Sequence, residues 1–326
     1  MTDGAEPRGE RSMAEEGLLA ERFEQHRGHL RAVAYRMLGS LSEADDAVQE
    51  AWLRLSRSGT SDVHNLGGWL TTVTGRVCLD MLRSRRTRRE ESMDAYETYL
   101  PDPVVRSLDR VDPEQEVLRA DAVGLALLVV METLEPAERL AFVLHDMFAV
   151  PFDDIAPVVD RSTAATRQLA SRARRRVQGS VPASDPDPAR QRQVVDAFLA
   201  ASRGGDFEAL LSVLDPEVVL RADAGALAVG AAASKQVRGR QSVAEGAFMF
   251  RQLSQYARPV LVNGSVGLLT VVDGTPVSVA SFTVVDGKIT AMHILSDPER
   301  LARLGLTALD DDRPASSTGD SGGTQG

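Results

Sequence analysis

The sequence predicts a multidomain protein in which two all-α segments, the second with a helix-turn-helix, precede an α+β domain. From Leu18 to about Arg89, and again from Glu114 to Gln178, apolar residues recur at intervals of three and four positions, as on the buried face of helices. After Arg258 the pattern changes to valine-rich runs separated by Asn-Gly and Asp-Gly pairs, which are typical of β-hairpins. The length of 326 residues suits two or three domains with separate cores.

Composition and charge exclude several classes of protein. The net charge of −10 argues against a protein that binds polyanions over its whole surface, so any contact with nucleic acid has to be local. The single cysteine, Cys78, excludes an intramolecular disulfide and a cysteine-based metal cluster, and we expect it to be buried among apolar neighbours. The chain starts without the pattern of a secretion signal and has no apolar run of about 20 residues. We therefore expect a cytoplasmic protein that uses no membrane, metal or cofactor.

The stretch SEADDAVQEAWLRLSR (42–57) predicts a helix with two distinct faces. We expect Ser42 to cap its N-terminus, where early carboxylates suit the helix dipole. The apolar stripe predicted to be buried consists of Ala44, Val48, Ala51 and Leu55. The opposite face carries an acidic and amide strip of Asp45, Asp46, Gln49 and Glu50. Such a strip can dock on a basic partner helix, and a merely solvated face is the alternative.

A basic island at 161–178, RSTAATRQLASRARRRVQ, contains no acidic residue. It follows two predicted helices, PAERLAFVLHDMF and PFDDIAPVV, and a tight turn, DRS, after which Ser162 or Thr163 can cap a third helix. This order is that of a helix-turn-helix, whose last helix enters the major groove of DNA. The residues expected to face the core are Thr166, Leu169, Ala170, Ala173 and Val177. Those left outside, which can reach phosphates and base edges, are Arg167, Gln168, Ser171, Arg172 and Arg175.

A second basic island, RVCLDMLRSRRTRR (76–89), follows LGGWLTTVTG on one predicted helix. This helix carries Trp69, Thr72, Arg76 and Asp80. An exposed ring beside hydroxyls and arginines suits unstacked bases, whereas a core position is the alternative for Trp69. Together the two islands predict a protein that grips duplex DNA at one place and opened DNA at another, with a solvated basic surface as the alternative.

Three stretches resemble the extracytoplasmic-function sigma factors of bacterial RNA polymerase, over residues 18 to 179 and in the order of that family. They are EADDAVQEAWLRL, similar to its polymerase-binding helix, GGWLTTVTGRVCLDMLRSRRTRR, similar to its minus-ten segment, and LEPAERLAFVLHDMFAVPFDDIAPVVDRSTAATRQLASRARRRV, similar to its minus-thirty-five domain. The resemblance implies two sigma domains that direct core RNA polymerase to promoter DNA.

The resemblance implies a binding partner for each of these three surfaces. The strip Asp45, Asp46, Gln49 and Glu50 is expected to meet the clamp helices of the polymerase's largest subunit. The residues expected at the minus-ten element are Asn65, Trp69, Thr72, Arg76, Arg83 and Arg86. The residues expected at the minus-thirty-five element are Arg161, Thr163, Arg167, Gln168, Ser171, Arg172 and Arg175.

Residues 188 to 300 resemble the SnoaL-like, ketosteroid-isomerase-type cone, in which helices precede a curled sheet around a pocket. A subgroup of these sigma factors carries such an extension, and both YLPDPV and LSDPERL resemble motifs of that subgroup. Where the subgroup has a glycine-rich turn after the first strand, this chain has ADAGALAVG, which keeps Asp223 and Gly225. We expect the cone to modulate the factor by intramolecular contact with the sigma domains or with the linker residues Tyr99, Leu100, Pro101, Asp102 and Pro103.

The expected boundaries follow from these patterns. A disordered N-terminus (1–17) precedes the first sigma domain (18–90), a linker (91–112), the helix-turn-helix sigma domain (113–179) and a second linker (180–187). The cone (188–300) and a mostly disordered tail (301–326) complete the chain.

Two other functions compete with a non-enzymatic sigma factor. One is a helix-turn-helix regulator with a ligand-sensing cone, which leaves EADDAVQEAWLRL and GGWL without a role. The other is a cone-domain isomerase or hydrolase tethered to DNA, which needs a carboxylate or histidine in the pocket, with Asp223, His293 and Asp196 as candidates. Because no nucleophile or oxyanion donor accompanies them, we expect no catalytic residue, and a pocket ligand stays unassigned.

Overall fold

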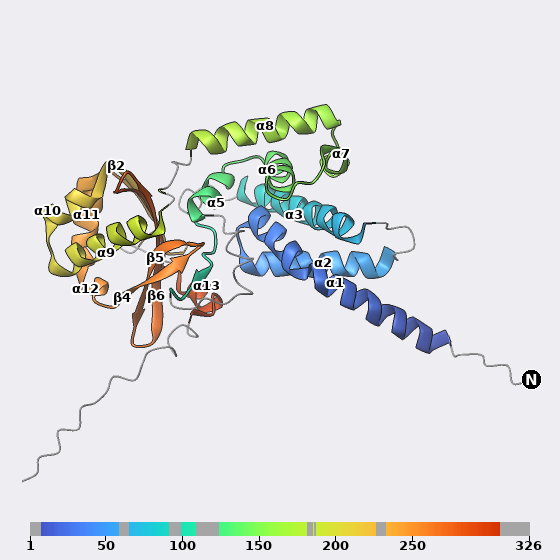
Figure 1. The fold of residues 1–326 in the computed structure, drawn as a ribbon, viewed down its shortest axis with the longest axis horizontal. Helices are drawn as coiled ribbons and strands as arrows, with labels where there is room; N and C mark the ends of the chain where they lie inside the picture. The colour runs from blue at the N-terminus through green and yellow to red at the C-terminus, as the bar shows by residue number, and fades with distance from the viewer. Residues whose placement is uncertain are drawn as a thin grey trace, which may run out of the picture. The chain divides into compact units, whose positions relative to one another are not determined.

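The structure is a computed structural model that describes residues 8–58, 65–90, 99–108, 124–180, 185, 187–225 and 233–306 (Figure 1). The chain divides into two compact units. Unit 1 comprises Met1–Asp102 and Val123–Ala183, and unit 2 comprises Pro103–Ala122 and Ser184–Gly326.

Unit 1 begins with three helices that pack on one another: α1 (Arg8–Leu38), α2 (Leu41–Ser58) and α3 (Leu66–Glu90) (Figure 1). Helix α1 begins at Arg8, ahead of Leu18, where the apolar pattern of the sequence begins. The stripe predicted on α2 is confirmed, since Ala44, Val48, Ala51 and Leu55 are all buried.

The second part of unit 1 is also helical: α5 (Leu125–Met131), α6 (Pro136–Phe142), the π-helix η1 (Val143–Met147), α7 (Phe152–Ile155) and α8 (Thr163–Ser180). The sequence predicts one long helix from Glu114 followed by short ones. Residues 114–123 lie outside the described ones, and α5 covers only 7 residues before a turn leads to Pro136, which starts α6. The long helix of this part is α8, with 18 residues.

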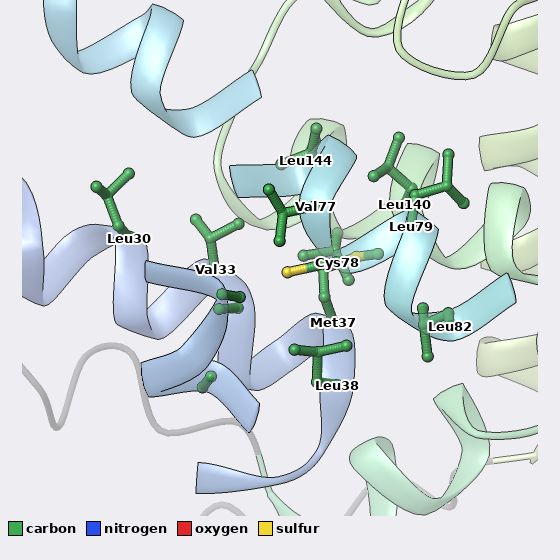
Figure 2. Packing of buried hydrophobic residues seen from close by; sticks show 14 of the residues in the cluster. Leu30, Val33, Met37, Leu38, Val77, Cys78, Leu79, Leu82, Leu140 and Leu144 are labelled. Atoms are coloured by element: carbon green, nitrogen blue, oxygen red, sulfur yellow. The ribbon is translucent and has the colours of Figure 1, made fainter. Parts of the chain in front are cut away.

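The two helical parts of unit 1 share one hydrophobic core (Figure 2). Gly75 of α3 lies against Leu140 and Leu144, so close that a Cβ atom at this position would be 3.0 Å from a methyl carbon of Leu144. Cys78, one helical turn further on, is fully buried in the same cluster. Close approach of α3 to α6 and η1 therefore depends on the missing side chain of Gly75.

Unit 2 combines helices with one seven-stranded sheet. The helices are α9 (Pro188–Gly204), α10 (Phe207–Val213), α11 (Arg240–Met249), α12 (Arg251–Ser254) and α13 (Pro298–Arg303). The strands are β1 (Val105–Arg106), β2 (Leu214–Asp223), β3 (Lys235–Arg238), β4 (Ala257–Val262), β5 (Ser265–Val272), β6 (Thr275–Val285) and β7 (Lys288–Leu295). The strand order is β1-β4-β5-β6-β7-β2-β3, and apart from the parallel pair β2 and β7 the pairs are antiparallel.

The predicted hairpins are confirmed, and their turns explain the register. Asn263, Asp273 and Asp286 have φ between 49° and 50°, and the glycine after each also has positive φ. Asn-Gly and Asp-Gly tolerate this conformation in a two-residue turn, which fixes the pairing of β4, β5, β6 and β7. Strand β1 was not predicted; it comes from the linker and pairs Val105 with Val262.

The sheet of unit 2 has two differently covered faces. Leu220 and Met292 point to the face that packs against α9 and α11. Leu295 points to the opposite face, where Leu301 of α13 covers it. Because side chains alternate along a strand, Asp223 and His293 fall on this second face.

Candidate nucleic-acid interface

The helix-turn-helix is formed by α6 with η1, α7 and α8. Asp160 in the turn before α8 has φ 53°, a left-handed conformation that aspartate tolerates. Of the two possible caps, Ser162 serves, because its Oγ accepts a hydrogen bond from the backbone N–H of Ala165 at 3.2 Å. The hydroxyl of Thr163 instead donates to Asp153 of α7 at 2.8 Å, which ties the two helices together.

The exposed face of α8 carries the predicted contact residues Arg167, Gln168, Ser171, Arg172 and Arg175. Arg161 is exposed in the turn before the helix, and Thr163 is half-buried. Thr166, Ala170 and Ala173 are buried on the other face. Arg167 lies over the ring of Phe152, 5.7 Å from its centroid, which orients the guanidinium at the start of the helix. Arg161 donates to the carbonyl of Asp160 at 3.1 Å.

Several arginines of this island bind acidic residues of unit 1. Arg172 Nε donates to Glu138 at 2.8 Å, and Arg174 pairs with Asp146 at 2.5 Å. Arg176 lies 3.6 Å from the second oxygen of Glu138. Arg172 thus anchors α8 on α6 while half of its side chain stays exposed. Sequence reasoning missed these partners, because residues 28 and 34 positions apart leave no local pattern that pairs them.

The predicted minus-ten residues lie along α3. Asn65 caps the helix, accepting a hydrogen bond from the N–H of Gly68 at 3.0 Å. Trp69 is half-buried against the core, and Thr72 donates to its carbonyl at 2.8 Å. Arg76 and Arg83 are exposed. Arg86 forms an ion pair with Glu135, so one member of this group is engaged with the second helical part of unit 1.

The acidic strip on α2 is exposed at Asp45, Asp46 and Gln49 and half-buried at Glu50. Asp45 pairs with Arg31 at 2.6 Å and Glu50 with Arg54 at 2.9 Å. These two carboxylates are therefore partly neutralised within unit 1.

The predicted cap of α2 is wrong, and the linker provides the actual one. The helix starts at Leu41, ahead of Ser42, and the N–H of Leu41 donates to Oδ2 of Asp102 at 3.0 Å. Asp102 is itself fixed, because its N–H donates to the carbonyl of Gly39 at 2.7 Å and its carbonyl accepts from the Tyr35 hydroxyl at 2.6 Å.

The rest of the predicted linker motif is also ordered. Leu100, Pro101 and Pro103 are buried and Tyr99 is half-buried. Pro101 packs against Gly39, which has φ 69°. Any other residue at position 39 would place its Cβ atom 3.3 Å from the Cβ atom of Pro101. Within unit 2, the N–H of Val104 donates to Oδ1 of Asn263 at 3.0 Å, and the N–H of Asn263 donates to the carbonyl of Val104 at 2.8 Å.

The three candidate catalytic groups of unit 2 lie away from its cavity, and the two carboxylates form ion pairs. Asp223 pairs with Arg300 at 2.7 Å, and Asp196 pairs with Arg192 at 3.0 Å. His293 is 6% exposed, and burial, with a smaller contribution from Arg221, lowers its pKa to about 4. None of the three is among the described residues that line the cavity of this unit.

Comparison with known proteins places this geometry in a family. Residues 22–88 match the model of Sigma-70 region 2, and residues 124–177 match Sigma-70, region 4. The ECF RNA polymerase sigma factor SigJ of Mycobacterium tuberculosis is 40% identical over 294 residues, covering 85% of this chain and 91% of that protein. The chain belongs to the ECF RNA polymerase sigma factors.

The sigma factor is similar to a second curated protein and to a solved structure. The probable ECF RNA polymerase sigma factor SigI of Mycobacterium tuberculosis is 37% identical over 294 residues, covering 89% of this chain and 97% of that protein. The crystal structure of SigJ superposes with a TM-score of 0.68 at 37% identity, covering 87% of this chain and 98% of that chain.

These matches and the structure confirm the predicted fold class, with two all-α sigma domains before an α+β domain. As an alternative sigma factor, the protein directs transcription as a subunit that binds core RNA polymerase and promoter DNA. No helix in the described part of the chain is long and apolar enough to cross a membrane.

Proposed function

We propose that this sigma factor reads the minus-thirty-five element with the exposed face of α8 and the minus-ten element with α3. Three arginines of the basic island, Arg172, Arg174 and Arg176, pair with acidic residues of unit 1. The side chains best placed to enter a major groove are therefore the other exposed ones on α8: Arg167, Gln168, Ser171 and Arg175. Arg76 and Arg83 supply positive charge along the exposed side of α3.

We further propose that unit 1 has to open before both elements can be bound. Elements near positions −35 and −10 lie about 25 base pairs apart, which is about 85 Å along duplex DNA. Helices in contact have axes about 10 Å apart, and in unit 1 α3 packs on α6 and α6 on α8. Two reading surfaces joined through a single intervening helix therefore cannot span that distance.

The contacts that close unit 1 identify where opening occurs. The Nε and Nη2 atoms of Arg139, from α6, donate to the carbonyl of Arg36, in α1, at 3.2 and 3.1 Å. Arg139 is 2% exposed and pairs with Glu132 at 2.7 Å. Replacing Arg139 would therefore leave the Glu132 carboxylate without this cation. Gly75 against Leu144 completes the apolar part of the contact. Promoter binding has to compensate for the loss of these contacts.

A large side chain in place of Gly75 tests whether unit 1 can open. Gly75→Leu should enlarge the radius of gyration of the free protein in small-angle X-ray scattering, because the new side chain would overlap Leu140 and Leu144. Gly28→Leu is the matched control, since a Cβ atom there meets nothing within 4 Å. Equal scattering and equal promoter binding with core polymerase for both variants would contradict the proposal.

The SnoaL-like domain is proposed to modulate this opening through the linker. Asp102 is fixed in unit 1 and Val104 in unit 2, with one residue between them along the chain. A shift of the sheet in unit 2 would therefore pull on Val104 and, through the one intervening residue, on Asp102 at the start of α2. Asn263→Ala, which removes the side-chain acceptor for Val104, should change promoter-directed transcription without changing the promoter sequence recognised. Asp273→Ala, in a turn of the same conformation away from the linker, is the control.

We also propose that unit 2 regulates and binds without catalysing a reaction, and that the protein works in the cytoplasm with the polymerase. The observation that supports this is the position of Asp223, His293 and Asp196 away from the cavity. A promoter-directed transcription assay with core polymerase tests the sigma activity as a whole. Loss of promoter selectivity only on removal of unit 2 would favour the ligand-sensing regulator instead.

A further inference from the structure

Unit 2 contains a cavity of about 340 Å³ between the helices and the sheet face that packs on them. Its walls come from α9, α11, α12 and from strands β2 to β7. Most of the lining is apolar, as represented by Phe198, Val243, Leu268, Phe282 and Met292. The volume is at the lower end of the range for pockets that hold small organic molecules.

One buried hydroxyl in this cavity lacks a partner. Ser202 of α9 lines the cavity, is 4% exposed, and its Oγ makes no hydrogen bond to any described residue. A buried hydroxyl without a partner is unfavourable, and native proteins pair most such groups. Across the cavity, Ser278 donates to Thr270 at 3.0 Å, so this second pair of hydroxyls is internally satisfied. Ser202 is therefore the polar group that an occupant would bind.

The charge of the lining restricts the occupant. Among the described lining residues there is no aspartate, glutamate, histidine or arginine, and the ammonium group of Lys235 lies 5.7 Å from the ring centroid of Phe250 at the rim. A cationic ligand would have no counter-ion among these residues, and its burial would be strongly unfavourable. The one ammonium group of the described lining already lies against an aromatic ring, so an uncharged ligand is favoured over an anion.

The break between α11 and α12 offers an entrance. Phe250 and Leu253 line the cavity and are also 40% and 42% exposed, so their side chains reach from the interior to the solvent. Met249 next to them is exposed but does not line the cavity. Side chains at the end of one short helix and the start of another can shift to admit a molecule.

We propose that this pocket binds a small, uncharged, apolar molecule that carries a single hydroxyl, aryl amine or carbonyl group, with Ser202 as its hydrogen-bond partner. The apolar body fills the space between the helices and the sheet, and the polar group reaches Oγ of Ser202. This inference does not depend on the opening of unit 1.

Binding is tested with N-phenyl-1-naphthylamine, a neutral dye that fluoresces in apolar sites and carries one N–H group. The full-length protein should bind it saturably with one site per chain. Gly246→Leu should weaken binding at least tenfold, because Gly246 lines the cavity and a Cβ atom there meets open space. Ala280→Leu, on the sheet wall, is a second filling variant. Both should melt cooperatively by circular dichroism.

A control variant distinguishes dye bound in the cavity from dye bound to the exposed apolar surface around Met249. Met249→Ser, which reduces that surface without entering the cavity, should leave dye binding unchanged. Loss of binding in Met249→Ser with retention in both filling variants would overturn the proposal, as would a linear, non-saturating signal.

The role of Ser202 is tested by competition against the dye. In the parent protein 2-naphthol should displace the dye at a several-fold lower concentration than naphthalene, since it adds one hydroxyl to the same rings. In Ser202→Ala the two should displace it equally. Equal competition by both compounds in the parent protein would remove Ser202 from the site.

Discussion

The side chain of Asp102 accepts a hydrogen bond at 3.0 Å from the backbone N–H of Leu41, the first residue of α2. A residue from the linker thus caps the helix that carries the acidic strip. The N-terminal N–H groups of a helix have no partner within it, so a carboxylate here satisfies a donor and complements the helix dipole.

Asp102→Ala should lower the free energy of unfolding of unit 1 by about 1 kcal/mol, as for other N-cap carboxylates. Urea denaturation followed by tryptophan fluorescence measures this, because Trp52 and Trp69 both lie in unit 1. Asp187→Ala is the control, since Asp187 caps α9 of unit 2 through the N–H of Ala189 at 2.9 Å. An unchanged midpoint for Asp102→Ala would show that the cap is dispensable.

Removal of Arg167 should weaken binding to the cognate promoter by about 1–3 kcal/mol, because the side chain lies at the start of the exposed face of α8. Arg174→Ala should cost less, since Arg174 faces Asp146 and contributes less to the exposed surface. Electrophoretic mobility shift at moderate salt, with holoenzyme and promoter DNA, distinguishes them. The same loss for both variants would point to a general electrostatic effect.

Replacing Asp46 and Gln49 together by lysine should weaken assembly with core polymerase while the protein stays folded, because both side chains are on an exposed helix face. Pull-down with core polymerase measures the affinity. Replacing Glu21 and Gln25 together by lysine is the matched charge control, because both are exposed on α1 and the change in charge is the same. If only the control variant loses affinity, the docking surface lies on α1.

Unit 2 should lose stability as the pH falls below about 6.5, because its buried histidine resists protonation. His293 has a pKa of about 4 in the fold, against an ordinary value of 6.5. Above both values the side chain is neutral in the folded and unfolded chain, so its contribution to stability is fully present. Between them the unfolded chain takes up the proton first, and the free energy of unfolding falls by about 1.4 kcal/mol per pH unit. Below about pH 4 both states are protonated and the loss stops.

His293→Phe should reduce this dependence. Urea midpoints by circular dichroism at about pH 7.5 and about pH 5 would then differ less in the variant than in the parent. Parallel shifts in the two proteins would assign the pH dependence to other groups.

Local patterns predicted the elements whose formation depends on neighbours in the sequence. The Asn-Gly and Asp-Gly turns gave the hairpins of unit 2, and the apolar stripe of α2 and the buried face of α8 followed from helical spacing. The exposed set on α8 was derived in the same way, since the side opposite a buried stripe is necessarily outside.

Contacts between distant segments were not predictable in this way. Ser42 was the local choice for the cap of α2, but Asp102, 61 positions from Leu41, provides it. The pairing of Arg172 with Glu138 joins positions 34 apart, and the partnerless Ser202 is apparent only once the sheet closes over α9. Strand β1 has two residues, too few for a periodic pattern, and exists because β4 presents a partner.

Strand β1 also protects the sheet. It occupies the outer side of β4, while the other border of the sheet is β3, a strand of 4 residues that includes Lys235 and Arg238. An unpaired border strand is a template for aggregation, and short, charged strands limit that risk. A fragment that begins after residue 107 would leave backbone groups of Leu261 and Asn263 unpaired, among them the N–H of Asn263 that donates to the carbonyl of Val104, and prone to associate with another copy. Preparations of the isolated SnoaL-like domain should therefore retain the linker from Pro103 onward to stay monodisperse.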